Sequence, residues 1–123
     1  MRYYNIQDRS GFGRRWRLIA LTLTGAGYGV IEAADGAEGY AKAISNPVNA
    51  VLTDLNMPVM NGLDFIRKFR MHPSSTGVPI VFLTTESDEN MKAQARAAGA
   101  TGWIVKPFKQ DQLLAVIRKV AGA

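Results

Sequence analysis

The chain alternates short, mostly apolar runs with longer segments in which apolar residues recur every three or four positions. The runs are bounded by turn residues, and several are rich in β-branched side chains, a pattern typical of buried parallel strands. The four clearest candidate strands cover residues 28–32, 49–54, 78–83 and 101–105. A fifth candidate, residues 3–7, is polar for a strand at the centre of a sheet.

Five segments between and beside these runs have the spacing of helices with one buried face. They cover residues 14–24, 37–44, 63–71, 88–98 and 110–120. The segment at 88–98 begins with an Asp that can cap a helix and is followed by Gly99, a helix-stop signal. Strands that alternate with helices of this length predict βαβ units, a parallel sheet and an α/β fold.

Composition limits the class of protein. A chain of 123 residues with 47% hydrophobic residues predicts one folded domain, residues 1–123. The absence of cysteine excludes disulfides, thiolate metal sites and cysteine nucleophiles. No apolar run approaches the roughly 18 residues of a membrane span, and the first residues are too polar for a secretory signal. We therefore expect a soluble, cytoplasmic protein with no membrane partner.

The net charge of +5 is concentrated at the start of the chain. Residues 1–18 carry five arginines against one acidic residue, Asp8, so this stretch holds four of the five excess charges. A nucleic-acid-binding domain would instead carry a basic stripe across a folded face. We expect no nucleic-acid partner, and a monomer rather than a dimer.

Three polar side chains follow three different predicted strands. Asp54 ends one strand, Thr84 ends the next, and Lys106 follows the last. Ligands of an open parallel sheet gather beyond the carboxyl ends of its strands. Each residue alone has an ordinary explanation, as a cap, a β-former or a loop charge. Together a carboxylate nucleophile, a hydroxyl donor and a fixed cation favour phosphoryl transfer.

Several motifs around these residues occur in order and at fixed spacing. They are Glu-Ala-Ala-Asp-Gly at 32–36, Asp-Leu-Asn-Met-Pro at 54–58 with Gly62, Phe-Leu-Thr-Thr at 82–85, Gly-Ala-Thr-Gly-Trp at 99–103 and Lys-Pro-Phe at 106–108. With them the chain resembles bacterial response-regulator receiver domains, especially stand-alone chemotaxis regulators of the CheY type. The resemblance covers about residues 18–123.

The resemblance implies a flavodoxin-like, doubly wound five-stranded sheet in the order 2-1-3-4-5, with helices on both faces. It implies that a histidine kinase phosphorylates Asp54 with the help of Mg²⁺, and that Thr84 and Lys106 contact the phosphoryl group. Asp54 and the backbone carbonyl of Asn56 would be Mg²⁺ ligands. The chain would be a phosphoacceptor rather than an enzyme acting on other molecules.

The resemblance also implies a switch. Trp103 occupies the position of the family's switch aromatic, and its size is expected to restrict an inward swing. A downstream protein would bind the face formed by the fourth helix and the fifth strand. Because the chain ends just after the last predicted helix, we expect the signal to be read by protein contact rather than by an output domain.

One part of the family pattern is altered. Family members carry two adjacent acidic residues and a serine after the first strand. Matching Asp8-Arg9-Ser10 to them replaces one carboxylate by Arg9, and an ungapped count from residues 21–24 places the pair on Ser10-Gly11. The first alignment loses one carboxylate and the second leaves none, so Asp8 is a tentative ligand and Mg²⁺ binding is expected to be weakened. Arg9 is expected to pair with Asp54 in its place.

Two alternatives stay open. With the acidic pair altered, the chain can be read as a pseudo-receiver or engineered variant with impaired Mg²⁺-dependent phosphorylation, acting as a protein-binding module. The glycine-containing stretch at residues 10–15 resembles a loop that cradles phosphate at the start of a helix. It gives weak support to a remodelled ligand site. The first 17 positions are atypical of the family, which fits either a naturally diverged or an engineered segment.

Overall fold

The computed structural model describes residues 2–6, 13–33, 36–46, 48–54, 62–84, 89–105 and 108–121. The strands are β1 (Arg2–Ile6), β2 (Gly29–Ala33), β3 (Ala50–Asp54), β4 (Ile80–Thr84) and β5 (Gly102–Val105). The α-helices are α1 (Gly13–Gly25), α2 (Gly36–Ser45), α3 (Gly62–Arg70), α4 (Glu89–Ala98) and α5 (Gln110–Ala121). Strands and helices therefore alternate as the hydrophobic pattern predicts.

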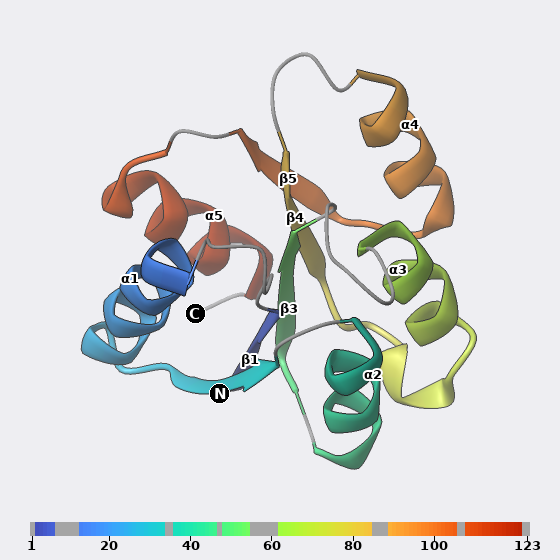
Figure 1. The fold of residues 1–123 in the computed structure, drawn as a ribbon, viewed down its shortest axis with the longest axis horizontal. Helices are drawn as coiled ribbons and strands as arrows, with labels where there is room; N and C mark the ends of the chain where they lie inside the picture. Colours follow the sequence, from blue (N-terminus) through green and yellow to red (C-terminus); the bar gives the residue numbers. More distant parts are fainter. Residues whose placement is uncertain are drawn as a thin grey trace.

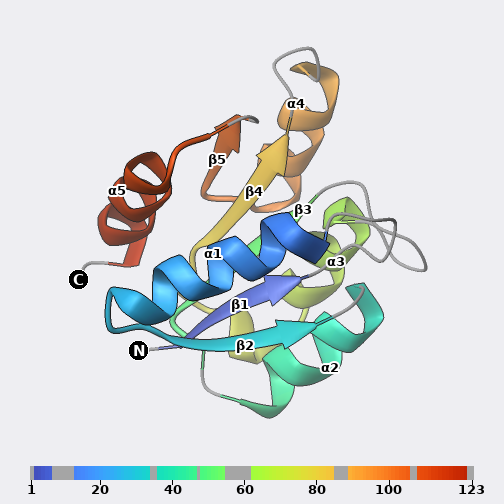
Figure 2. The ribbon, with the colours of Figure 1, turned by 60° about the vertical axis from the view of Figure 1, so that its left-hand side comes forward.

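The strands form one parallel sheet in the order β2-β1-β3-β4-β5. The predicted doubly wound, flavodoxin-like fold is confirmed, and the polar first segment lies between β2 and β3 as expected for a central strand. Helices α1 and α5 cover one face of the sheet, and α2, α3 and α4 cover the other (Figures 1 and 2). This arrangement brings the carboxyl ends of neighbouring strands to one edge.

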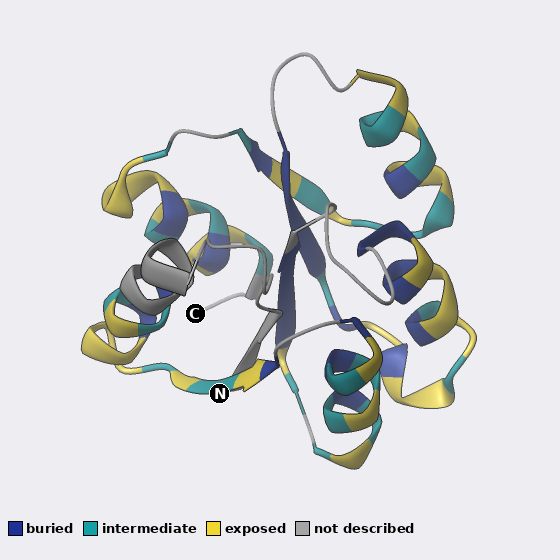
Figure 3. Ribbon diagram, in the orientation of Figure 1, coloured by how far each residue is buried: buried dark blue, intermediate teal, exposed yellow. Residues whose placement is uncertain are grey.

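Two apolar cores hold these layers together. The first, which we call the α2–α4 core, joins side chains of α2, α3 and α4 to one face of the sheet. The second, the α1/α5 core, joins α1 and α5 to the opposite face. Strand β4 is buried along its whole length, which matches its apolar sequence (Figure 3). Successive residues of β3 and β4 contribute to opposite cores, the two-residue period of a strand.

One short element was not predicted. A single turn of 3₁₀-helix, η1 (Pro73–Ser75), follows α3. His72 caps it, because its Nδ1 atom accepts a hydrogen bond of 3.1 Å from the backbone N–H of Ser74. His72 therefore caps the backbone of this turn. Strand β4 starts at Ile80, two residues later than predicted.

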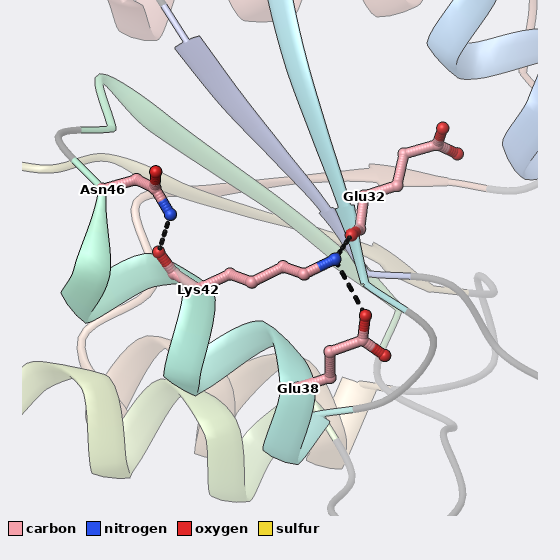
Figure 4. Close-up of polar contacts among 4 residues, drawn as sticks. All are labelled: Glu32, Glu38, Lys42 and Asn46. Atoms are coloured by element: carbon pink, nitrogen blue, oxygen red, sulfur yellow. Dashed lines mark hydrogen bonds and ion pairs between the residues drawn. The ribbon is translucent and has the colours of Figure 1, made fainter.

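Lysine 42 links the edge strand β2 to helix α2 (Figure 4). Its ammonium group donates a hydrogen bond of 2.6 Å to the backbone carbonyl of Glu32 and pairs with Glu38 at 2.8 Å. Its own backbone carbonyl accepts a hydrogen bond from the side chain of Asn46, 2.9 Å away. The half-exposed ion pair adds little stability by itself, but the bond to the strand fixes α2 relative to the edge of the sheet.

Arginine 70 joins the end of α3 to the turn before β5. Its Nε donates to the carbonyl of Gly99 at 3.0 Å, and Nη1 donates to the carbonyl of Ser75 at 2.7 Å. Burial lowers the pKa of the Arg70 guanidinium from its ordinary value. Gly99 ends α4 with a φ of +113°, so the predicted glycine stop is confirmed.

We expect Gly99→Ala to lower the free energy of unfolding by about 1–3 kcal/mol, because a non-glycine residue is strained at this positive φ. A Cβ atom there would also meet Arg70 Cγ at 2.9 Å and disturb the bond to the turn. Gly25→Ala is the matched control, since its Cβ would meet nothing within 4 Å and its φ is not positive. Urea unfolding of both variants measures the difference, and equal midpoints would contradict the prediction.

Candidate functional site

Two of the site residues predicted from the sequence, Asp54 and Thr84, end strands at the carboxyl edge of the sheet. In the register of the parallel strands, Asp54 of β3 lies opposite Leu83 of β4, and Thr84 lies opposite Val105 of β5. Neighbouring strands are about 4.8 Å apart. Asp54 and Thr84 therefore stand on adjacent strands, one position out of register, and Lys106 is the next residue after Val105.

Strand β1 ends at the same edge. Ile6 lies opposite Thr53, so the chain leaves β1 beside the last residues of β3. The proposed ligands Asp8 and Asn56, together with Lys106, lie outside the described residues, and so does Arg9. Within the described ranges, no three His, Asp or Glu side chains come together as a metal site would require. The Mg²⁺ assignment thus stays a prediction that rests on strand positions.

Threonine 84 is 3% exposed. Residues two apart on a strand share a face, so Thr84 lies on the same side of the sheet as Phe82, which belongs to the α2–α4 core. Its register partner Val105 lies on that side with Trp103, because the two residues of β5 are also two apart. The hydroxyl expected to contact phosphate and the aromatic expected to respond therefore belong to the same face of adjacent strands.

Tryptophan 103 lies opposite Phe82, and their ring centroids are 6.2 Å apart with an angle of 34° between the planes. The residue is 36% exposed, so its ring is neither buried nor free of contacts. Two cations of α4 lie over it. The Arg96 Cζ atom is 4.8 Å from the ring centroid, and the Lys92 Nζ atom is 5.7 Å from it. Sequence reasoning singled out Trp103 but missed both cations.

Comparison with known proteins identifies the family to which this chain belongs. Residues 15–118 match the family model of the response regulator receiver domain. The chain belongs to the response-regulator receiver family. This match begins inside α1, so it covers β2 to β5 but not β1.

Solved receiver structures resemble this one over nearly the whole chain. The Vibrio cholerae chemotaxis protein CheY4 is 39% identical, with a TM-score of 0.88 and 97% of each chain covered. The receiver domain of the Pseudomonas aeruginosa sensor histidine kinase PA1611 is 25% identical, with a TM-score of 0.88, 99% of this chain and 98% of that one covered. That structure has a magnesium ion coordinated in its active-site cleft.

A longer curated relative matches as well. The response regulator ArlR of Staphylococcus aureus is 38% identical over 104 residues, which are 85% of this chain and 46% of ArlR. The chain thus spans about half the length of the curated relatives it matches. No helix within the described ranges is long and apolar enough to cross a membrane.

The donor set of this receiver suits a hard cation. Asp54 ends β3, and a backbone carbonyl at position 56 and a carboxylate at position 8 would be oxygen ligands of the type that Mg²⁺ prefers. Asp8 comes two residues after Ile6, the last residue of the strand that neighbours β3. These oxygen donors are of the kind that such an ion takes, and the predicted match of Asp8-Arg9-Ser10 to the family pattern would put Arg9 in place of a second carboxylate.

Proposed function

We propose that this receiver accepts a phosphoryl group on Asp54 and passes the change to a protein partner. An oxygen of the Asp54 carboxylate attacks the phosphorus of a phosphohistidine or a small acyl phosphate. A new P–O bond forms, and the bond to the leaving group breaks. Because charge spreads over the phosphoryl oxygens in this transfer, catalysis rests on positioning and neutralisation rather than on further bond chemistry.

The observation that supports this most is the strand-end geometry. Asp54 and Thr84 end neighbouring parallel strands one register step apart, and position 106 directly follows the strand beside them. A carboxylate, a hydroxyl and an ammonium thereby start from adjacent backbone positions. The Thr84 hydroxyl would donate to a phosphoryl oxygen, and the Lys106 ammonium would neutralise the added charge of about −2.

Magnesium would neutralise charge between the carboxylate and the phosphoryl group when it is bound. Asp54, the Asn56 carbonyl and Asp8 are the residues that would hold it. Both alignments of the acidic pair, on Asp8-Arg9 or on Ser10-Gly11, would remove at least one anionic ligand, so we propose a weaker ion site than one with two adjacent acids.

The test is incubation with acetyl phosphate over a range of Mg²⁺ concentrations, followed by intact mass. We expect a Mg²⁺-dependent gain of one phosphoryl group, with half-maximal uptake at a higher Mg²⁺ concentration than for a receiver with two adjacent acids. Arg9→Asp should shift that midpoint to lower Mg²⁺. No gain in a folded protein would contradict the proposal.

We expect Thr84→Val to slow phosphoryl uptake by about tenfold to a hundredfold, because it removes a donor to a charged group. Valine keeps the branched shape in a position that is buried in the sheet. Thr84→Ser, which keeps the hydroxyl, should retain most of the rate. Uptake rates from intact mass, with circular dichroism as a check of folding, decide this, and a Val variant as fast as the parent would contradict the role.

The partner surface proposed is the face of α4 and β5, where Trp103 is partly exposed beside two cations. A histidine kinase would be the phosphoryl donor. The alternative function, a pseudo-receiver that binds proteins without phosphorylation, is favoured by Arg9 at an acidic position. The acetyl phosphate experiment separates the two, because a pseudo-receiver gains no mass at any Mg²⁺ concentration.

A further inference from the structure

Helix α4 is attached to the sheet by little apolar surface. Its sequence is rich in alanine, and Ala95 is the residue that it buries fully. Met91 and Ala98 pack against the α2–α4 core while only partly buried. The helix stands beside the edge strand β5, at the outer end of its layer, and its largest helix contact is with α3 (Figure 1). Small side chains give a helix few dispersion contacts, so other contacts must contribute to its position.

Lysine 92 and Arg96 provide such contacts. They are four residues apart and therefore lie on the same side of α4. Both reach Trp103 of β5, with the Arg96 guanidinium carbon 4.8 Å and the Lys92 nitrogen 5.7 Å from the ring centroid. A cation within about 6 Å of an indole face is attracted by its negative electrostatic potential. The ring in turn rests against Phe82 on the neighbouring strand.

The lysine is unusually well covered for a surface cation. Its side chain is 11% exposed, whereas that of its ion-pair partner Glu89 is 82% exposed, at an N–O distance of 3.1 Å. The aliphatic part of Lys92 therefore packs while its charged end is shared between Trp103 and Glu89. A partly desolvated cation over an indole is stabilised more strongly than an exposed one.

We infer that Lys92 and Arg96 close on Trp103 as a cationic clamp that holds α4 against β5. The same contact restricts the rotation of the Trp103 side chain. The ring can turn inward only by breaking its contacts with both cations, and α4 then loses this attachment to β5. This regulatory consequence rests on the proposed phosphorylation, because Thr84 lies on the same face of the adjacent strand and would be drawn toward the phosphoryl group. The size of tryptophan and the clamp act in the same direction, and both favour the outward ring.

The clamp is tested first without phosphate. Lys92→Met with Arg96→Met keeps both aliphatic stems and removes both charges. We expect hydrogen exchange of α4 backbone amides to accelerate by about fivefold to thirtyfold, the factor that two cation–π contacts represent. Exchange in α5 should not change. Lys119→Met, on the exposed side of α5, removes a charge without touching the ring and should leave α4 as in the parent.

A double-mutant cycle that includes Trp103 tests whether its ring is the partner of the two cations. Trp103→Leu alone should accelerate α4 exchange by a similar factor, and adding the two methionine substitutions should accelerate it little further, because their partner is already absent. Unchanged α4 exchange in the methionine variant, or full additivity with Trp103→Leu, would overturn the clamp.

The regulatory consequence is read from the parent protein after acetyl phosphate treatment. Phosphorylated parent protein should show α4 exchange close to that of the methionine variant. Phosphorylation with α4 still protected would overturn the release. Absence of any phosphoryl uptake would instead contradict the proposed function. The hydrogen-exchange measurements on the unphosphorylated variants would then decide by themselves whether the clamp exists.

Discussion

Replacing Asp54 with asparagine is expected to abolish phosphoryl uptake from acetyl phosphate. The amide that replaces the carboxylate has no anionic oxygen to attack phosphorus, and the substitution also removes the proposed Mg²⁺ ligand at the end of β3. Since nucleophile and ion ligand are lost together, we expect no detectable mass gain at any Mg²⁺ concentration. Intact mass after a fixed incubation measures the result.

Asp64→Asn is the matched control for this variant. Asp64 lies on the exposed side of α3, where its carboxylate is 3.7 Å from Arg67. The Asp64→Asn substitution makes the same chemical change away from the strand ends. A half-exposed ion pair of this kind contributes little to stability. Uptake equal to that of the parent is expected. Phosphorylation of the Asp54→Asn protein at the parent rate would show that another side chain is the acceptor.

Replacing Phe69 with alanine is expected to lower the free energy of unfolding by about 3–5 kcal/mol, the usual cost of removing a buried ring. Phe69 is fully buried in the α2–α4 core, and its ring stacks on Phe65 with centroids 5.7 Å apart and 13° between the planes. The total free energy of unfolding of a small domain is only about 5–15 kcal/mol, so this substitution would remove a large part of it.

Urea unfolding followed by far-ultraviolet circular dichroism measures that loss. The matched control is Met71→Ala, two residues further on, where the side chain is 86% exposed. We expect its free energy of unfolding to change by no more than about 0.5 kcal/mol. Similar losses in the two variants would mean that Phe69 does not carry the packing that the structure assigns to it.

The sequence predicts the architecture of this receiver because its signals are local and repeated. Apolar runs such as β3 and β4, which end at Asp54 and Thr84, indicate both the strand and the edge at which its last residue lies. The short turn η1 was missed because it depends on a side-chain cap from His72, which has no periodic signal. Neither secondary-structure propensity nor hydrophobic periodicity predicts a single capping hydrogen bond of that kind.

The cations over Trp103 were missed for a different reason. Their spacing in α4 is visible in the sequence, but many exposed helix faces carry two cations four residues apart. Which side of α4 meets β5 depends on how the helix is placed on the sheet. The roles of Asp8, Asn56 and Lys106 stay predictions, because they lie outside the described residues and rest on their positions next to known strand ends.

The place of β1 in the sheet has a consequence for shortened forms of the protein. Strand β2 is at the edge, and β1 is its neighbour in the strand order and pairs with all five of its residues. A fragment cut to the family match at residue 15 would lack β1. Residues Gly29–Ala33 would then have lost their partner strand, and Ala50–Thr53 of β3 would become a new open border. Such a fragment would offer open strand borders for intermolecular pairing, borders that Arg2–Ile6 covers in the whole chain.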